Sequence, residues 1–121
     1  MHENKLFIGA DVSKLSIDFT LLFEDQVEHQ SVDNTPAALT TYLKAIKSRF
    51  GLDDDMIFVG VENTGRYSLP VLQAFSEFNI NLYLLSPLHL SKSQGLVRGK
   101  SDEIDSQRIA RFLKKNLDEL A

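Results

Sequence analysis

Residues 5–24, KLFIGADVSKLSIDFTLLFE, contain the two segments from which the fold is predicted. The first, residues 5–13, has a run of apolar side chains followed by two small residues and Asp11, a pattern typical of a buried strand that ends at the acid. The second, residues 16–24, alternates apolar with polar side chains, which predicts a strand with one buried face. Because the connection between them is short, we expect the two strands to pair antiparallel.

The next segments extend this pair in two ways. Residues 26–33 are more polar and predict an edge strand, so the first three strands form a meander. The hydrophobic period then changes to that of a helix, with Thr35 as the N-cap, Pro36 as the first helical residue and Gly51 as the stop.

The remaining segments alternate between strands and helices. Residues 56–62 and 80–86 are apolar on both faces, which predicts strands buried on both sides. A helix is expected to begin near Tyr67, because Pro70 is tolerated only in a first turn, and a last helix runs from Ser101 towards Leu117. The order is three strands, then helix, strand, helix, strand and helix. It predicts an α/β fold with a mixed five-stranded sheet in the ribonuclease H-like order.

Length and composition limit the classes of protein. The 121 residues suffice for one domain with one modest core. The absence of cysteine excludes disulfides, thiolate metal sites and a thiol nucleophile. No apolar stretch approaches the ~20 residues of a membrane span, and the first residues do not resemble a secretory signal. We therefore expect a cytoplasmic protein that has no membrane partner.

The charge is unevenly distributed along the chain. The net charge is −4, yet residues 86–115 carry 7 basic and 3 acidic side chains, whereas residues 1–85 carry 6 basic and 12 acidic ones. A local basic patch of this kind can hold phosphates on an acidic protein. From charge alone, a solvated helix face is an equally good interpretation.

Carboxylates occur where three of the predicted elements begin or end. Asp11 and Glu62 each follow an apolar strand, and they would emerge side by side if those strands are parallel neighbours. Asp102 and Asp105 begin the last helix, where ~100° per residue places them ~60° apart on the face that continues as the apolar stripe. The cations of this helix are expected on the opposite side; they are Arg108, Arg111, Lys114 and Lys115.

Four converging carboxylates repel one another, and this repulsion must be offset. Each like-charged pair costs roughly 1–4 kcal/mol at ~4 Å. Divalent cations would offset this cost, and ligands that are all oxygen favour Mg²⁺ or Mn²⁺ over zinc. Such ions can activate a hydroxyl nucleophile and stabilise the leaving oxygen of a phosphodiester.

Three motifs resemble one known family. IGADVSK with Asp11, VENTGRY with Glu62, and KSDEIDS with Asp102 and Asp105 look like the DEDD transposases of bacterial insertion sequences, a family that includes the pilin-gene invertases. The resemblance implies that residues 1–121 form a RuvC-like catalytic domain that binds Mg²⁺ or Mn²⁺ through these four acids. It implies DNA cleavage and strand transfer at element ends and target DNA.

The resemblance also carries expectations about the full-length protein. Many members are thought to be guided by a structured RNA and to assemble as homo-oligomers. They carry a second, C-terminal domain with a nucleophilic serine, which is absent from this chain.

Basic residues near the acids are candidates for nucleic-acid contacts. Those on turns and on the loop before the last helix are Lys14, Arg66, Lys92, Arg98 and Lys100. For Arg66, a role in the turn into the second helix is the stronger interpretation. The three histidines show no ligand spacing and are interpreted as surface or structural residues.

Three other functions remain open from the sequence. A RuvC-like Holliday-junction endonuclease would share the fold, the acids and the metal. An actin-like or sugar-kinase ATP-binding domain also opens with a strand ending in Asp, but its phosphate loop needs glycine where Val12 and Ser13 stand. A non-catalytic nucleic-acid-binding or oligomerisation module would not need the four acids.

Overall fold

The computed structural model describes residues 4–63, 65–86 and 102–120, with the backbone alone for 102–104 and 118–120. Its centre is a five-stranded sheet in the order β3-β2-β1-β4-β5. The strands are β1 (Leu6–Val12), β2 (Ser16–Phe23), β3 (Gln26–Asp33), β4 (Ile57–Glu62) and β5 (Asn81–Leu85). The first three form an antiparallel meander, and β4 and β5 run parallel to β1. The predicted mixed sheet is confirmed.

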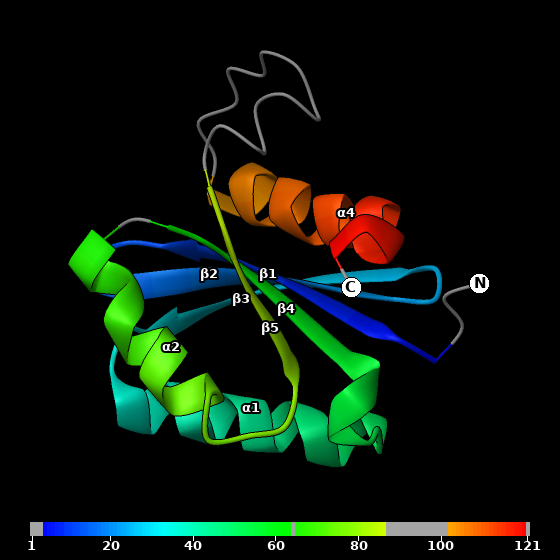
Figure 1. Ribbon diagram of the computed structural model, residues 1–121. Helices are drawn as coiled ribbons and strands as arrows, with labels where there is room; N and C mark the ends of the chain where they lie inside the picture. The colour runs from blue at the N-terminus through cyan, green and yellow to red at the C-terminus, as the bar shows by residue number, and fades with distance from the viewer. Residues whose placement is uncertain (1–3, 64, 87–101, 121) are drawn as a thin grey trace.

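Helices cover both faces of this sheet. Figure 1 shows α1 and α2 on one face and α4 on the other. The helices are α1 (Pro36–Phe50), α2 (Leu69–Phe75) and α4 (Asp102–Leu120), with 3₁₀ turns η1 (Asp54–Met56) and η2 (Gly65–Ser68) before β4 and α2. None of the helices within the described residues is long and apolar enough to cross a membrane.

The ends of α1 follow from side-chain and backbone chemistry. Thr35 Oγ1 accepts a hydrogen bond from the amide of Ala38 at 3.2 Å, which satisfies one unpaired donor of the first turn. Gly51 ends the helix with φ of 63°, a left-handed conformation that costs glycine little. Both predicted boundaries are confirmed.

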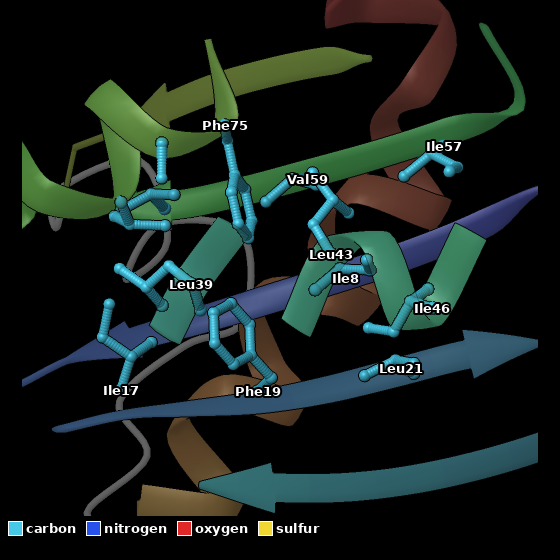
Figure 2. Close-up of a cluster of buried hydrophobic side chains, with 14 of the residues drawn as sticks. Ile8, Ile17, Phe19, Leu21, Leu39, Leu43, Ile46, Ile57, Val59 and Phe75 are labelled. Carbon is cyan, nitrogen blue, oxygen red and sulfur yellow. The ribbon is translucent and has the colours of Figure 1, made fainter. Parts of the chain in front are cut away.

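The main core lies between the sheet and the layer of α1 and α2. In Figure 2, Ile8 and Phe19 from the sheet meet Leu39 and Leu43 from α1 and Phe75 from α2. All five side chains are buried, and the Phe19 and Phe75 rings stack with their centroids 6.0 Å apart. Each such side chain contributes roughly 1.5–3 kcal/mol on burial.

A second core lies under α4 and corrects the expectation for β2. The predicted solvent face of β2 is covered by α4, and Thr20 and Leu22 on that face are 0% and 4% exposed. Thr20 Oγ1 lies 2.6 Å from Ser106 Oγ of α4, so the buried polar groups satisfy each other. The alternating pattern of β2 therefore separates two buried faces, one apolar and one partly polar.

The expectation that residues 80–86 form a strand buried on both faces is wrong. β5 is an edge strand, and Leu84 is 49% exposed on it, because the chain adds this strand outside β4. Leu69 is 60% exposed because α2 begins there, after η2, and buries Val71, Ala74 and Phe75 instead.

Two glycines allow α4 to lie close to the sheet. A Cβ added to Gly9 of β1 would lie 2.1 Å from the carbonyl oxygen of Ser106 and 2.5 Å from the amide nitrogen of Ala110. A Cβ added to Gly60 of β4 would lie 3.0 Å from side-chain atoms of Leu113. The contact at Gly9 is therefore made between backbones, and any larger residue there must displace the helix.

This contact gives a stability prediction. Gly9→Ala is expected to lower the free energy of unfolding by at least about 2 kcal/mol, because the α4 backbone cannot yield without losing its packing. The control Gly60→Ala should cost less than about 1 kcal/mol, because the Leu113 side chain needs to move by only a few tenths of an ångström. Urea denaturation of both variants measures the difference, and equal losses would contradict the backbone contact.

Candidate metal and nucleic-acid site

Asp11 and Glu62 lie next to each other at the carboxyl ends of two parallel strands. Ala10 of β1 pairs with Val61 of β4, and the two acids are the next residue of each strand. Both are half-buried. By alternation, Asp11 shares the face of Gly9, and Glu62 that of Gly60, the two residues on which α4 packs. Both carboxylates therefore lie on the side of the sheet that α4 covers.

Asp105 of α4 comes close enough to Glu62 to affect its protonation. Burial raises the pKa of the Glu62 carboxyl above its ordinary value, and the negative charge of Asp105 raises it further. The guanidinium of Arg108 partly offsets both effects. The structure thus places Glu62 and Asp105, which are 43 positions apart in the chain, in one electrostatic environment.

The fourth predicted ligand lies at the edge of the described region. Asp102 begins α4 as predicted, but its side chain lies outside the described part of the chain. Among the side chains that the structure describes, no three His, Cys, Asp or Glu groups lie close enough to hold an ion. The complete set of four ligands therefore stays a prediction.

Arg108 departs from the expected arrangement of cations. Its Nη1 lies 3.6 Å from Asp105 Oδ1, and its side chain is 23% exposed. The other cations of the helix, Arg111, Lys114 and Lys115, are exposed as predicted. The prediction that Arg108 turns away from the acids is wrong, because a side chain three residues after Asp105 lies beside it on a helix.

Asp18 is a further acid at this site that the sequence reasoning missed. It pairs directly with Asp11 across β1 and β2, so the two side chains share one face of the sheet. Thr20, two residues further along that face, contacts Ser106 of α4. The signal in the sequence was the alternation of Asp18 with apolar residues, which was interpreted as a solvent face.

A small pocket opens beside Asp18 between β2, β3 and α4, with a volume of about 130 Å³. Its lining residues are Asp18, Phe19, His29, Gln30, Ser31 and Ser106. His29 Nδ1 lies 2.8 Å from Thr20 Oγ1, which continues the hydrogen-bonded chain from Ser106 to the edge strand. His29 is thus a structural residue on an exposed strand, in agreement with the sequence.

The turns next to the acids carry exposed cations. Lys14 lies in the turn between β1 and β2, and Arg66 lies in η2 with its guanidinium 5.3 Å from the Tyr67 ring. The side-chain amide of Asn34 donates to the carbonyl oxygens of Ser13 at 2.8 Å and of Tyr67 at 3.0 Å. One residue therefore ties both turns together at the end of the sheet where the acids lie.

The other predicted nucleic-acid contacts cannot be placed. Lys92, Arg98 and Lys100 lie outside the residues that the structure describes. Gly65, in the turn after Glu62, has φ of 77°, which glycine adopts at little cost, and its amide donates to Asn63 Oδ1 at 3.2 Å.

The donor set at this end of the sheet has the chemistry of a hard-cation site. Carboxylates from two strands and one helix lie at this end of the sheet, on the side that α4 covers, and hard divalent cations prefer oxygen ligands of this kind. Glu62 is disfavoured as an anion in the metal-free protein, which a bound cation would reverse. The residues present therefore fit Mg²⁺ or Mn²⁺ by chemistry.

The sheet order and its two helical layers define an α/β domain of the ribonuclease H-like, RuvC-like class. A family model described as transposase, that of the IS110-type DEDD transposases, matches residues 8–121. The chain therefore belongs to this family. No curated protein matches the chain.

Solved structures support the fold. The T. thermophilus RuvC in complex with a Holliday junction substrate superposes with a TM-score of 0.66 at 12% identity, over 95% of this chain and 96% of that one. A Bacteroides thetaiotaomicron protein with an actin-like ATPase fold and unknown function superposes with a TM-score of 0.54 at 14% identity, over 69% of this chain and 33% of that one. At these identities the similarity concerns the fold.

The raised pKa of Glu62 gives a prediction on pH dependence. Because the folded-state pKa lies above the ordinary 4.5, the folded protein binds more protons than the unfolded one in the window above pH 4.5, and stability falls as pH rises through it. Glu62→Gln removes this titration. The variant should be more stable than the wild type at pH 7 in a chelating buffer, and the difference should vanish below about pH 4.

Thermal unfolding at both pH values measures this difference. A variant less stable than the wild type at pH 7 would show that the Glu62 carboxylate is favourable in the metal-free protein, contrary to its burial beside Asp105.

Proposed function

We propose that this chain is the catalytic domain of a DNA transposase, which cleaves and transfers DNA phosphodiesters with Mg²⁺ or Mn²⁺ held by Asp11, Glu62, Asp102 and Asp105. The observation that carries the proposal is that Asp11 and Glu62 are neighbours at the ends of β1 and β4, with Asp105 of α4 near enough to raise the pKa of Glu62. Membership of the DEDD transposase family supports it.

The acids would act by holding the cation rather than by transferring protons. When bound, the cation supplies the activation of a hydroxyl nucleophile and the stabilisation of the leaving oxygen. The strands supply rigidity, because Asp11 and Glu62 are fixed by the register of β1 and β4. The helix supplies Asp105, whose position depends on the packing of α4 at Gly9. Rigid elements of this kind hold ligands more accurately than loops do.

The nucleic acid would be held by cations around the acids. Lys14 and Arg66 lie on turns that Asn34 joins, and Lys92, Arg98 and Lys100 belong to the segment before α4. Contacts of this kind bind phosphates and give no sequence preference by themselves. We propose that target choice depends on a guide RNA, and that recombination needs a C-terminal serine-containing domain and a homo-oligomer.

A Holliday-junction endonuclease is the second candidate. The RuvC structure that resembles this chain was solved with a Holliday junction substrate, and the similarity covers nearly all of both chains. The two functions share the metal and the acids. They differ in substrate, because a junction endonuclease would cleave a four-way junction as the isolated domain.

A metal titration tests the proposed acid site. Mg²⁺ or Mn²⁺ should raise the melting temperature of the wild type, by an amount equivalent to about 2.7 kcal/mol at one hundred times the dissociation constant. Asp11→Asn and Asp105→Asn should each abolish this shift, because each removes a ligand charge. Asp53→Asn is the matched control, since Asp53 is an exposed acid in another part of the molecule.

The outcomes separate the candidates. An unchanged metal response in both Asp11→Asn and Asp105→Asn would refute the acid site. Specific cleavage of four-way junctions by the wild-type domain, lost in Asp11→Asn, would favour the endonuclease over the transposase.

A further inference from the structure

Arg108 is a cation placed within the acidic site rather than on the exposed face of its helix. Its Nη1 lies 3.6 Å from Asp105 Oδ1, and its charge acts on Glu62 as well. The Arg108 side chain is 23% exposed, whereas Arg111, three residues further along the same helix, is exposed to solvent. Arg108 therefore supplies positive charge beside Asp105 and near Glu62.

The geometry of this pair is that of a loose contact. At 3.6 Å the two atoms attract each other but are too far apart for a hydrogen bond. A divalent cation on Asp105 and Glu62 would provide their counter-charge and weaken the hold of Asp105 on the guanidinium. The guanidinium lies beside Asp105, and its planar donors have the geometry that suits the oxygens of a phosphate.

The backbone of Arg108 is also held in place. Its neighbours in the helix, Ser106 and Ala110, make the close contact with Gly9. A side chain that emerges from so rigid a segment can fix the position of a substrate group.

We propose that Arg108 is a positioning residue, which pairs with Asp105 in the metal-free protein and contacts a nucleic-acid phosphate once the cation is bound. The inference rests on the proposed function, because it requires a metal at the acids and a nucleic-acid substrate. Arg108 is thus a further nucleic-acid contact, beyond those expected from the sequence, and it lies next to the acids.

The test compares Arg108→Gln with the control Arg111→Gln in the full 121-residue chain. A fluorescently labelled DNA four-way junction serves as the probe, and its binding is measured with Mg²⁺ and with chelator over a series of salt concentrations. Arg108→Gln should weaken binding about 10-fold with Mg²⁺ and lower the salt slope by about one, but change binding much less in chelator. Arg111→Gln should show no such dependence on Mg²⁺.

A second readout is the metal response of the protein alone. Arg108→Gln should keep the Mg²⁺-induced rise in melting temperature and reach half of it at a lower Mg²⁺ concentration, because a competing cation has been removed. Arg108→Lys should keep the charge but recover the binding only in part, because lysine cannot contact a phosphate through two parallel donors.

Three results would overturn the inference. If Arg108→Gln and Arg111→Gln weaken junction binding equally, with and without Mg²⁺, Arg108 is one surface cation among several. Loss of the Mg²⁺-induced shift in Arg108→Gln would make its role structural. A wild type that shows no Mg²⁺ response would contradict the proposed function and this inference together, so the two failures are distinguishable.

Discussion

The close contact of α4 with β1 at Gly9 is the constraint on which the candidate site depends. A side chain at this position would overlap the backbone of Ser106, so the helix reaches its place only over glycine. Asp105 directly precedes Ser106 in the chain, and Asp11 follows Gly9 by two residues. One backbone contact therefore connects the position of the helix acid with that of the strand acid. The buried hydrogen bond between Ser106 and Thr20 stabilises the same interface on the side of β2.

This arrangement brings like charges together at a cost. Asp11 and Asp18 pair across neighbouring strands, and Asp105 disfavours the ionised form of Glu62. Opposed like charges destabilise a sheet, and a buried carboxylate loses hydration. Arg108 offsets part of this cost at Glu62. A divalent cation would stabilise a site whose carboxylates repel one another more than a site whose charges are already neutralised.

The sequence predicted the elements and the places of several candidate residues, because these depend on local patterns. The acids at the ends of β1 and β4 were found since each follows an apolar strand, and the caps of α1 were found since Thr35 and Gly51 have specific backbone roles. The burial of both faces of β2 was missed, because an alternating strand looks the same whether water or a polar helix face covers its second side. Asp18 was missed as a site residue for that reason.

The errors at β5 and Arg108 also have physical causes. An apolar segment has the same pattern at the centre of a sheet and at its edge, and only the strand order, set by long-range packing, places β5 outside β4. Arg108 was assigned to the outer face by helix angle alone. The angle is close to a boundary, and the attraction of Asp105 and Glu62 draws the long side chain to the inner side. Asp102 stays a prediction because its side chain lies outside the described residues.

The central claim is that acids from β1, β4 and α4 form one cation site. Paramagnetic broadening by Mn²⁺ in amide NMR spectra of the full chain tests it most directly, because the broadening falls steeply with distance from the ion. At substoichiometric Mn²⁺, the account predicts that the amide signals of Asp11, Glu62 and Asp105 broaden first and together, and that Asp11→Asn removes the effect. Broadening that begins instead at the exposed acids Asp53 and Asp55, at the opposite end of β4, would contradict it.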